Sequence, residues 1–363
     1  MTNQYFGMLV SKSKYIGLKR GRRTLNDVIR EEAAKKNNLI PCYIRFRHIK
    51  SGSNQVSVII FEDGRPLEKK IPYPRVIYNL VWASPYRNRK IQYLDNKGVL
   101  VFNKVNYLEK YKFQTLLEAN KEFLDYLPET QVLNAGNLKG MMKKYDKLIL
   151  KPDHGYVGRG IMKLYKEENE LWCLTYKVKQ DKKFVWKEER FIEGNVPNRL
   201  RDVLDKDFYL IQNIIPLATY KGSPFDFRVS TQRNQYGNWE VTAIIGKVAP
   251  EGNFLTNIGQ GGTQFSIEEL LLEYPHLNAK ELKDKMTSLA LKIANYFSQT
   301  TEQIGDLGFD LAITPKGEIY YIECNFCSAY KALTIRDGKL VHDEWRKVFT
   351  TPVDYARYLL NDM

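Results

Sequence analysis

A pattern near the C-terminus constrains the fold more than any other part of the chain. Two short apolar runs flank Thr314 to Gly317, where Pro at the second position and Gly at the fourth suit a type I turn. A two- or four-residue loop centred on this Pro-Lys pair predicts a β-hairpin in which Asp310 pairs with Tyr321. Opposed residues share a face, and so do alternate residues along a strand. Asp310, Glu323 and Asn325 should therefore project from one side.

These three polar side chains predict a metal site. Asp310 and Glu323 would be diagonal neighbours, roughly 7 Å apart at Cα, among apolar residues such as Ala312 and Ile319. Two buried acids repel each other and lose hydration unless a cation lies between them. Carboxylate and amide oxygens suit Mg²⁺, with phosphates and water completing its octahedron. Salt bridges to Arg or Lys are the alternative, and an odd-numbered loop would turn Asp310 to the other side.

A phosphate site is predicted where Lys151 ends an apolar strand. The loop that follows contains Gly155, Gly158 and Gly160, and glycines let backbone amides approach phosphate oxygens closely. The spacing is neither that of a P-loop nor that of the dinucleotide fingerprint. A plain hairpin turn is the alternative. A second glycine loop, from Asn257 to Gly262, is interpreted as a lid or an oxyanion-binding nest.

Two cations are predicted on one face of a second hairpin. Alternation places Arg228 on the same side as Asp226, and an even turn at residues 234–237 would set Arg228 opposite Ala243. Lys247 would then share this face. A guanidinium and an ammonium there could follow a triphosphate and offset the charge that develops in phosphoryl transfer. A solvated hairpin face is the alternative.

The predicted elements form three parts of α+β class. Helices and strands are mixed without regular βαβ alternation, which argues against a doubly wound sheet. Residues 1–104 form a small α/β domain with a helix capped by Thr24 and Asp27 and strands at 5–10, 40–46, 55–61 and 75–82. Residues 105–215 hold a helix at 107–126 and strands at 147–151, 161–165, 171–178, 184–186 and 208–215. Residues 216–363 hold strands at 225–231 and 239–248, helices opened by Ser266 with Glu269 and by Asn278 with Glu281, and the final hairpin.

Composition excludes several classes of protein. Four cysteines among 363 residues are too few for a disulfide scaffold, so a reduced cytoplasmic protein is expected, with ordinary packing for Cys324 and Cys327. No apolar run approaches the ~18 residues that span a bilayer, and no secretory signal or membrane insertion is expected. No nucleophile elbow or H-E-x-x-H motif is present.

The formal net charge of +14 favours polyanionic partners. Six Lys and Arg residues lie between Lys12 and Arg23 with no acid among them, and Arg87, Arg89 and Lys90 form a second cluster. No zinc-finger or RNA-binding signature accompanies the charge, so nucleic acid is not the expected partner. An ordinary solvated surface is the alternative.

The order of these motifs resembles the ATP-grasp superfamily and, more narrowly, the YheC/YheD family of endospore coat-associated proteins. The matching motifs are Lys151 with its glycine loop, Phe-Asp-Phe-Arg ending at Arg228, the loop beginning at Asn257, and Asp310 with Glu-x-Asn ending at Asn325. The resemblance covers about residues 71–363. It implies that two α+β subdomains, divided near residue 215, clasp ATP between them.

The resemblance also implies roles for individual residues. It implies that Lys110, with Lys112 as a substitute, and Lys151 contact phosphate, and that a hinge from Gln212 to Ile214 holds adenine. It implies that Arg228 contacts the γ-phosphate and the acyl phosphate, and that Lys247 is a further cation of the site. The Mg²⁺ ligands that it implies are Asp310, Glu323 and Asn325. Many members of the superfamily have an acid where this chain has Gln212.

The activity implied is that of an ADP-forming carboxylate–amine ligase that uses ATP and Mg²⁺. A carboxylate substrate would be activated as an acyl phosphate and joined to an amine. The basic N-terminal third permits an acidic peptide or polymer as substrate, and the family implies an association with spores. Two other functions stay open: a spore-coat-associated structural protein that binds nucleotide with little catalysis, and a basic nucleic-acid binder.

Overall fold

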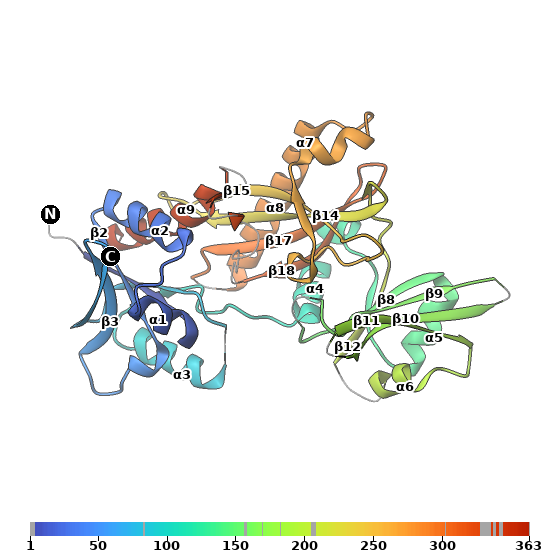
Figure 1. Cartoon of the computed structure of the whole chain (residues 1–363), viewed down its shortest axis with the longest axis horizontal. Coiled ribbons are helices and arrows are strands. Elements are labelled where there is room, and N and C mark those ends of the chain that lie inside the picture. The colour runs from blue at the N-terminus through green and yellow to red at the C-terminus, as the bar shows by residue number, and fades with distance from the viewer. Residues whose placement is uncertain are drawn as a thin grey trace.

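Three six-stranded sheets with flanking helices form the architecture, which is α+β as predicted (Figure 1). This computed structural model describes residues 4–82, 84–155, 158–168, 170–181, 183–204, 208–301, 303–326, 335–336, 339–340 and 344–362. The first sheet lies at the N-terminal end of the elongated molecule, the second at the far end, and the third between them. The three-domain division predicted from the sequence stays a prediction.

The first sheet is mixed, with the order β4-β3-β2-β1-β5-β6. Strands β2, β1, β5 and β6 are parallel to one another, and the β3–β4 antiparallel hairpin pairs antiparallel with β2. The strands are β1 (Gln4–Leu9), β2 (Leu39–Ile44), β3 (Gln55–Glu62), β4 (Arg65–Pro72), β5 (Val76–Asn79) and β6 (Leu100–Phe102). The helices are α1 (Lys12–Lys19), α2 (Leu25–Lys36), α3 (Pro85–Asp95) and the 3₁₀ turn η1 (Phe46–His48). The sequence did not predict α1, α3 or β4.

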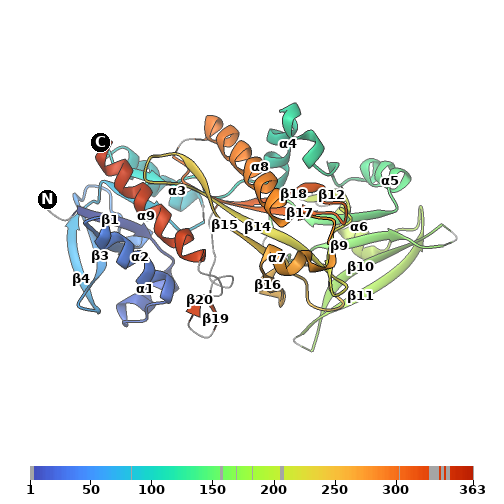
Figure 2. The same cartoon turned by 90° about the horizontal axis from the view of Figure 1, so that it is seen from above.

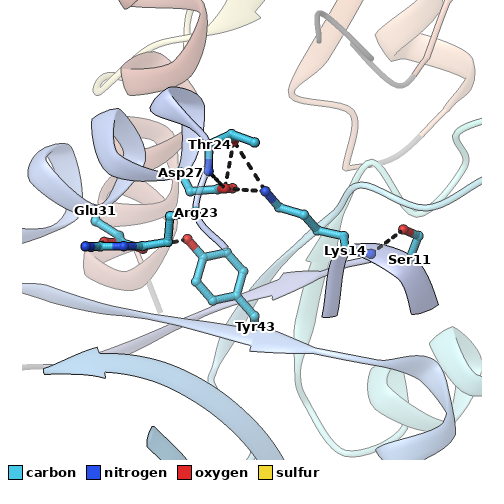
Figure 3. Close-up of polar contacts among 7 residues, drawn as sticks. All are labelled: Ser11, Lys14, Arg23, Thr24, Asp27, Glu31 and Tyr43. Atoms are coloured by element: carbon cyan, nitrogen blue, oxygen red, sulfur yellow. Dashed lines mark hydrogen bonds and ion pairs between the residues drawn. The ribbon is translucent and has the colours of Figure 1, made fainter. Parts of the chain in front are cut away.

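The start of α2 confirms the predicted cap and joins α2 to α1 (Figure 3). The Asp27 carboxylate accepts hydrogen bonds from the backbone N–H and the hydroxyl of Thr24, both at 2.7 Å. The same carboxylate forms an ion pair with the Lys14 ammonium of α1. Beside this pair, Glu31 accepts from Arg23 at 2.8 Å and from Tyr43 at 3.0 Å. A buried polar network thus fixes the α1–α2 corner and neutralises Lys14.

The second sheet is antiparallel throughout, with the order β11-β10-β9-β8-β12-β7. Its strands are β7 (Thr130–Val132), β8 (Lys147–Pro152), β9 (Met162–Lys166), β10 (Leu171–Gln180), β11 (Lys183–Ile192) and β12 (Tyr209–Asn213). Helices α5 (Ala135–Lys144) and α6 (Asn198–Leu204) bury one face of it. The predicted single helix at 107–126 is wrong, because α4 (Lys110–Glu118) ends before a 3₁₀ segment, η2 (Lys121–Tyr126), that the Asn120 side chain caps.

The third sheet follows the path β16-β15-β14-β17-β18, with β13 paired to β14. Its strands are β13 (Thr219–Tyr220), β14 (Ser223–Arg233), β15 (Trp239–Val248), β16 (Thr263–Phe265), β17 (Asp306–Ile313) and β18 (Ile319–Asn325). Around it lie η3 (Ile258–Gln260), α7 (Ile267–Leu270), η4 (Leu271–Glu273) and α8 (Ala279–Thr300), and β19 (Ile335–Arg336) pairs with β20 (Lys339–Leu340). The capping box of Ser266 is confirmed, and Asn278 caps α8 through the Glu281 N–H.

The C-terminal helix α9 (Trp345–Asn361) joins the first and third sheets. In Figure 2 it crosses α2 and the first sheet, and its apolar side chains pack with both sheets. Pro352 lies inside this helix and cannot donate a hydrogen bond to the Val348 carbonyl one turn earlier. The buried Gln232 side chain of β14 donates to that carbonyl instead, at 3.0 Å. The second sheet has a separate apolar core.

Candidate nucleotide and metal site

A cavity of about 530 Å³ lies between the second and third sheets. One wall comes from β8, β9, β12 and the loop after Lys151, and the other from β14, β17, β18 and residues 254–257. Of the predicted site residues, those that line this cavity are Lys110, Lys151, Gly155, Gly158, Gln212, Ile214, Asn257, Asp310 and Glu323. Residues far apart in the sequence are therefore brought together at one place.

The β17–β18 hairpin has the predicted turn but not the predicted register. The Gly317 N–H donates to the Thr314 carbonyl at 2.9 Å, and Gly317 has φ +81, which favours glycine. Ile313 pairs with Ile319, so the loop has five residues and the predicted pairing of Asp310 with Tyr321 is wrong. Such an odd loop moves a strand by one residue and inverts its faces.

A bulge reverses this inversion. Between Asp310 and Leu311 the register shifts, and Asp310 lies directly opposite Glu323. The predicted diagonal relationship is therefore wrong, whereas the shared face is correct. Asn325 follows two residues after Glu323 on the same face, opposite Gly308, with its Nδ2 3.5 Å from a Glu323 carboxylate oxygen.

Asp310 carries the ion pairs that the sequence left open as an alternative. Its carboxylate accepts from Arg228 Nε at 2.5 Å and from Arg228 Nη2 at 3.2 Å, and it lies 3.0 Å from Lys247 Nζ. Burial would raise the pKa of Asp310, but the two cations outweigh burial and hold this pKa at about 2. The carboxylate is thus ionised and fixed in place.

Asp226 completes a four-charge cluster that the sequence did not single out as functional. Its carboxylate lies 3.0 Å from Lys247 and accepts a hydrogen bond from the Thr256 hydroxyl at 2.7 Å. Burial raises the pKa of Asp226 to about 6, against the opposing effect of Lys247. The sequence did indicate that Asp226 belongs to this cluster, because it lies two residues before Arg228 on β14 and therefore on the same face of the strand.

The β14–β15 register also differs from the prediction. Arg228 pairs with Ile245, not with Ala243. The five-residue loop between Arg233 and Trp239 shifts the register by one residue, and the bulge after Ser230 shifts it by one more. Since this error amounts to two residues, Arg228 and Lys247 still share a face, as predicted.

The opposite wall carries the predicted phosphate lysines. Lys151 is 8% exposed and donates to the Gln212 side-chain carbonyl at 3.1 Å, while Gln212 donates to the Thr130 hydroxyl at 2.7 Å. Burial lowers the pKa of Lys151 to about 8. Lys110 is the first residue of α4 and donates to the Gly155 carbonyl at 2.6 Å. The substitute Lys112 lines a different cavity, together with residues such as His154 and Phe208.

The two glycine loops lie against each other. Gly158 has φ +64, and a Cβ atom there would come within 2.8 Å of Gln260 Nε2 and 2.9 Å of Asn257 Oδ1. The loop from Asn257 to Gly262 therefore closes onto the loop after Lys151. Residues 156–157 of that loop lie outside the described residues. Gly160 does not line the cavity and packs against Tyr209.

An apolar section of the cavity adjoins the predicted hinge. The residues that line this section are Ile149 of β8, Ile161 just before β9, and Ile214 and Leu217 after β12. The Ile214 N–H donates to the Lys147 carbonyl at 3.0 Å, which fixes the chain where it leaves the sheet. A flat aromatic base suits such a section.

The cysteine motif is only partly described. Cys324 packs against the apolar core of the third sheet, as predicted, and burial raises its pKa. Cys327 lies outside the described residues. Within the described part of the chain, no three His, Cys, Asp or Glu side chains cluster as a metal site.

A cavity between two α+β layers, with lysines and a glycine loop on one side and paired acids and a second glycine loop on the other, is the arrangement of an ATP-grasp protein. Solved structures have the same fold: the ATP-grasp ligase PsnB with a minimal precursor (TM-score 0.56, 14% identity, 98% of this chain and 99% of that chain) and D-alanyl-alanine synthetase A from Vibrio cholerae (TM-score 0.54, 12% identity, 99% and 97%). VanG D-Ala:D-Ser ligase from Enterococcus faecalis is also similar (TM-score 0.51, 12% identity, 98% and 100%).

The chain belongs to the YheC/D-like ATP-grasp family, whose profile matches residues 98–359. Two curated proteins from Bacillus subtilis are similar to it. Endospore coat-associated protein YheD is 28% identical over 71% of this chain, and endospore coat-associated protein YheC is 22% identical over 65%. The matches span 58% and 63% of the relatives' own lengths. Among the described helices, none has the length and apolar character needed to cross a membrane.

Proposed function

We propose that the protein is an ATP- and Mg²⁺-dependent, ADP-forming carboxylate–amine ligase. The observation that carries this proposal is the opposition of two walls across one cavity, with Lys151 and its glycine loop on one side and Asp310 and Glu323 on the other. A nucleotide whose phosphates contact the lysines would also face the two acids. A solved structure of PsnB, a ligase of the same fold, contains a variant of its minimal precursor together with Mg and ADP (TM-score 0.52).

The donor set fits Mg²⁺. Asp310, Glu323 and Asn325 share a face and supply carboxylate and amide oxygens, which are the ligands this ion prefers. Asp310 is ionised, and Arg228 and Lys247 would keep it so during turnover. When bound, the ion would neutralise charge on the β- and γ-phosphates.

The nucleotide would lie with its base in the apolar section and its phosphates toward Lys110 and Lys151. Lys151 is buried, so its charged form lacks hydration, and a phosphate beside it would compensate for that loss. The backbone amides of Gly155 and Gly158, which line the cavity, would add uncharged phosphate contacts. Gln212 would hold Lys151 in position through its carbonyl.

The proposed reaction has two steps. A substrate carboxylate oxygen attacks the γ-phosphorus of ATP, and the bond between that phosphorus and the β–γ bridging oxygen breaks. The products of this step are ADP and an acyl phosphate. An amine then attacks the acyl carbon, phosphate leaves, the amine nitrogen loses a proton and an amide forms. Arg228 and Lys247 would offset charge on the transferring group. The contact between the two glycine loops would exclude water, which hydrolyses acyl phosphates.

The test supplies ATP, Mg²⁺ and pools of amino acids or acidic peptides, and follows phosphate release together with product mass. We expect Asp310→Asn and Glu323→Gln each to reduce turnover by about two orders of magnitude or more. Glu318→Gln, an exposed acid in the same hairpin, is the matched control. Unchanged turnover in both site variants would sink the metal assignment.

A second candidate is a spore-coat-associated protein that binds nucleotide with little catalysis. The names of both Bacillus subtilis relatives favour it, and we propose a cytoplasmic origin with spore association for either function. Thermal-shift measurements with ATP, with and without Mg²⁺, separate the two when read beside phosphate release. Binding without turnover on any substrate pool would favour the structural role.

A further inference from the structure

The first sheet has one strongly basic edge. Four loops, taken together with η1 and with the first turns of α1 and α3, follow the carboxyl ends of its parallel strands, at residues 10–14, 45–50, 80–90 and 103–108. Together they contain nine Lys and Arg residues and no Asp or Glu. We call this surface the basic edge, and its cations are Lys12, Lys14, Arg45, Arg47, Lys50, Arg87, Arg89, Lys90 and Lys104.

Contacts between the four loops show that they form one surface. Tyr15 of α1 packs edge-on against His48, with ring centroids 4.9 Å apart. Lys90 of α3 donates to the Ile49 carbonyl at 2.8 Å, and the Arg87 guanidinium lies 6.0 Å from the Phe46 ring centroid. The fourth loop joins through a hydrogen bond from the Asn106 amide to the Val81 carbonyl.

Few of these cations are neutralised by the protein itself. Lys14 is paired with Asp27, and Lys104 lies 3.6 Å from Asp95. Arg87 and Lys90 are held by backbone carbonyls, which orient their charges without cancelling them. Among the described residues, no carboxylate lies within 4.0 Å of Lys12, Arg47, Lys50 or Arg89, all of which are exposed.

The positive charge of the basic edge affects the pKa of the neighbouring His48. Burial lowers the pKa of His48, and the positive charges of Arg45 and Arg47 lower it further. Two lysines elsewhere around this sheet have carboxylate partners: Lys19 of α1 pairs with Glu68, and Lys69 of β4 pairs with Glu62. Exposed cations that form no ion pair with the described residues also lie away from the basic edge, such as Lys70 and Arg75, so what distinguishes the basic edge is that its four loops contain no acid.

The strand order marks this edge as the place where sheets of this kind bind ligands. After β1 the chain turns through α1 and α2 to β2 on one side, whereas after β5 it turns through α3 to β6 on the other. The loops after β1 and β5 therefore diverge, and ligands of open α/β sheets bind at such a point, outside the carboxyl ends of the strands.

The basic edge is continuous with the nucleotide cavity. Its fourth loop ends two residues before Lys110, which lines that cavity and donates to Gly155. In the same loop, Tyr107 forms a hydrogen bond with His154, which belongs to the loop after Lys151. A ligand along the basic edge would thus reach the place where the γ-phosphate is expected.

We propose that the basic edge binds a peptide segment bearing several carboxylates, and presents one of them to the nucleotide cavity. This inference rests on the proposed function, because an enzyme that phosphorylates a carboxylate has a use for a polycarboxylate beside the phosphate site. Several neighbouring carboxylates match several cations that lack partners in the protein. Nucleic acid offers the same charge but no carboxylate to activate.

The test is direct binding of a fluorescein-labelled hexaglutamate peptide, followed by anisotropy at low and at physiological salt. The variant Arg47→Glu/Arg89→Glu reverses two exposed charges of the basic edge. The control Lys139→Glu/Lys143→Glu makes the same change on exposed lysines of α5, behind the second sheet. A labelled single-stranded oligonucleotide of equal formal charge is the competing probe.

We expect the Arg47/Arg89 variant to lose about tenfold or more in hexaglutamate affinity at low salt, and the α5 control less than about twofold. ATP-dependent thermal stabilisation should be unchanged in both variants. No binding by the wild type, equal losses in the two variants, or tighter binding of the oligonucleotide with the same sensitivity would overturn the proposal. If the Arg47/Arg89 variant loses hexaglutamate affinity as expected but the protein neither hydrolyses ATP nor transfers its phosphate, the peptide-binding site would stand and the proposed ligase function would be wrong.

Discussion

Asp310 and Arg228 lie directly opposite each other on β17 and β14, joined by two hydrogen bonds inside the cavity wall. Lys247 adds a third contact to the same carboxylate. Two cations therefore depend on Asp310 for charge compensation, and the site is assembled before any ligand arrives.

Replacing this acid should cost stability as well as activity. Asp310→Asn leaves two buried cations with one carboxylate, and we expect it to lower the free energy of unfolding by about 3 kcal/mol. Because the pKa of Asp310 in the folded protein, about 2, lies below the ordinary 3.8, its contribution is complete above 3.8 and is lost as the pH falls through 2. The stability gap to wild type should therefore shrink between pH 4 and pH 2 in denaturant titrations. Asp284→Asn, on an exposed turn of α8, should show neither effect.

The comparison of sequence and structure shows what a period-two pattern can predict. The shared face of Asp310, Glu323 and Asn325 was predictable because alternation survives any even error in register. Their pairing was not, because the bulge beside Leu311 inserts one apolar residue among other apolar residues and leaves no mark in the sequence. The same holds for the bulge after Ser230.

Helices were predicted correctly where local hydrogen bonds at the cap determine the helix start. They were missed where packing against distant parts of the chain stabilises the helix. Thr24 with Asp27 and Ser266 with Glu269 cap helices as predicted, since these bonds are local. The C-terminal helix α9 was missed because Pro352 argues against a helix interior. Its stability comes from packing between two sheets and from Gln232, both of which are distant in sequence.

Gln232 and Pro352 should be energetically coupled. Gln232→Leu leaves the Val348 carbonyl and the Thr242 hydroxyl without their buried partner, and should destabilise the protein by about 2–4 kcal/mol. Pro352→Ala restores a backbone N–H that can donate to Val348. In that background Gln232→Leu should cost measurably less. Urea titrations of the double-mutant cycle give the coupling, and purely additive effects would contradict this account.

Nucleotide affinity should depend on pH through Lys151. Its pKa, about 8, is below the ordinary 10.5 because the ammonium is buried, so the free protein loses this charge as the pH rises above 8. Phosphates favour the charged form, and ADP affinity should fall by up to about tenfold per pH unit above 8. Calorimetry between pH 7.5 and 9.5 measures this. Lys151→Arg keeps its charge and should flatten the profile, whereas Lys147→Arg, in the same cavity wall, should leave it as in wild type.

The contact between the glycine loops provides a prediction with a matched control. Gly158 and Gly252 both have positive φ, +64 and +70, so an alanine at either position costs about 1 kcal/mol of backbone strain. Only at Gly158 would the new methyl group collide with Gln260 and Asn257, since nothing lies within 4 Å at Gly252. We expect Gly158→Ala to weaken ATP binding about tenfold or more and Gly252→Ala less than twofold, at similar losses of thermal stability. Equal weakening by both would show that strain alone, and not the closure of one loop onto the other, governs nucleotide binding.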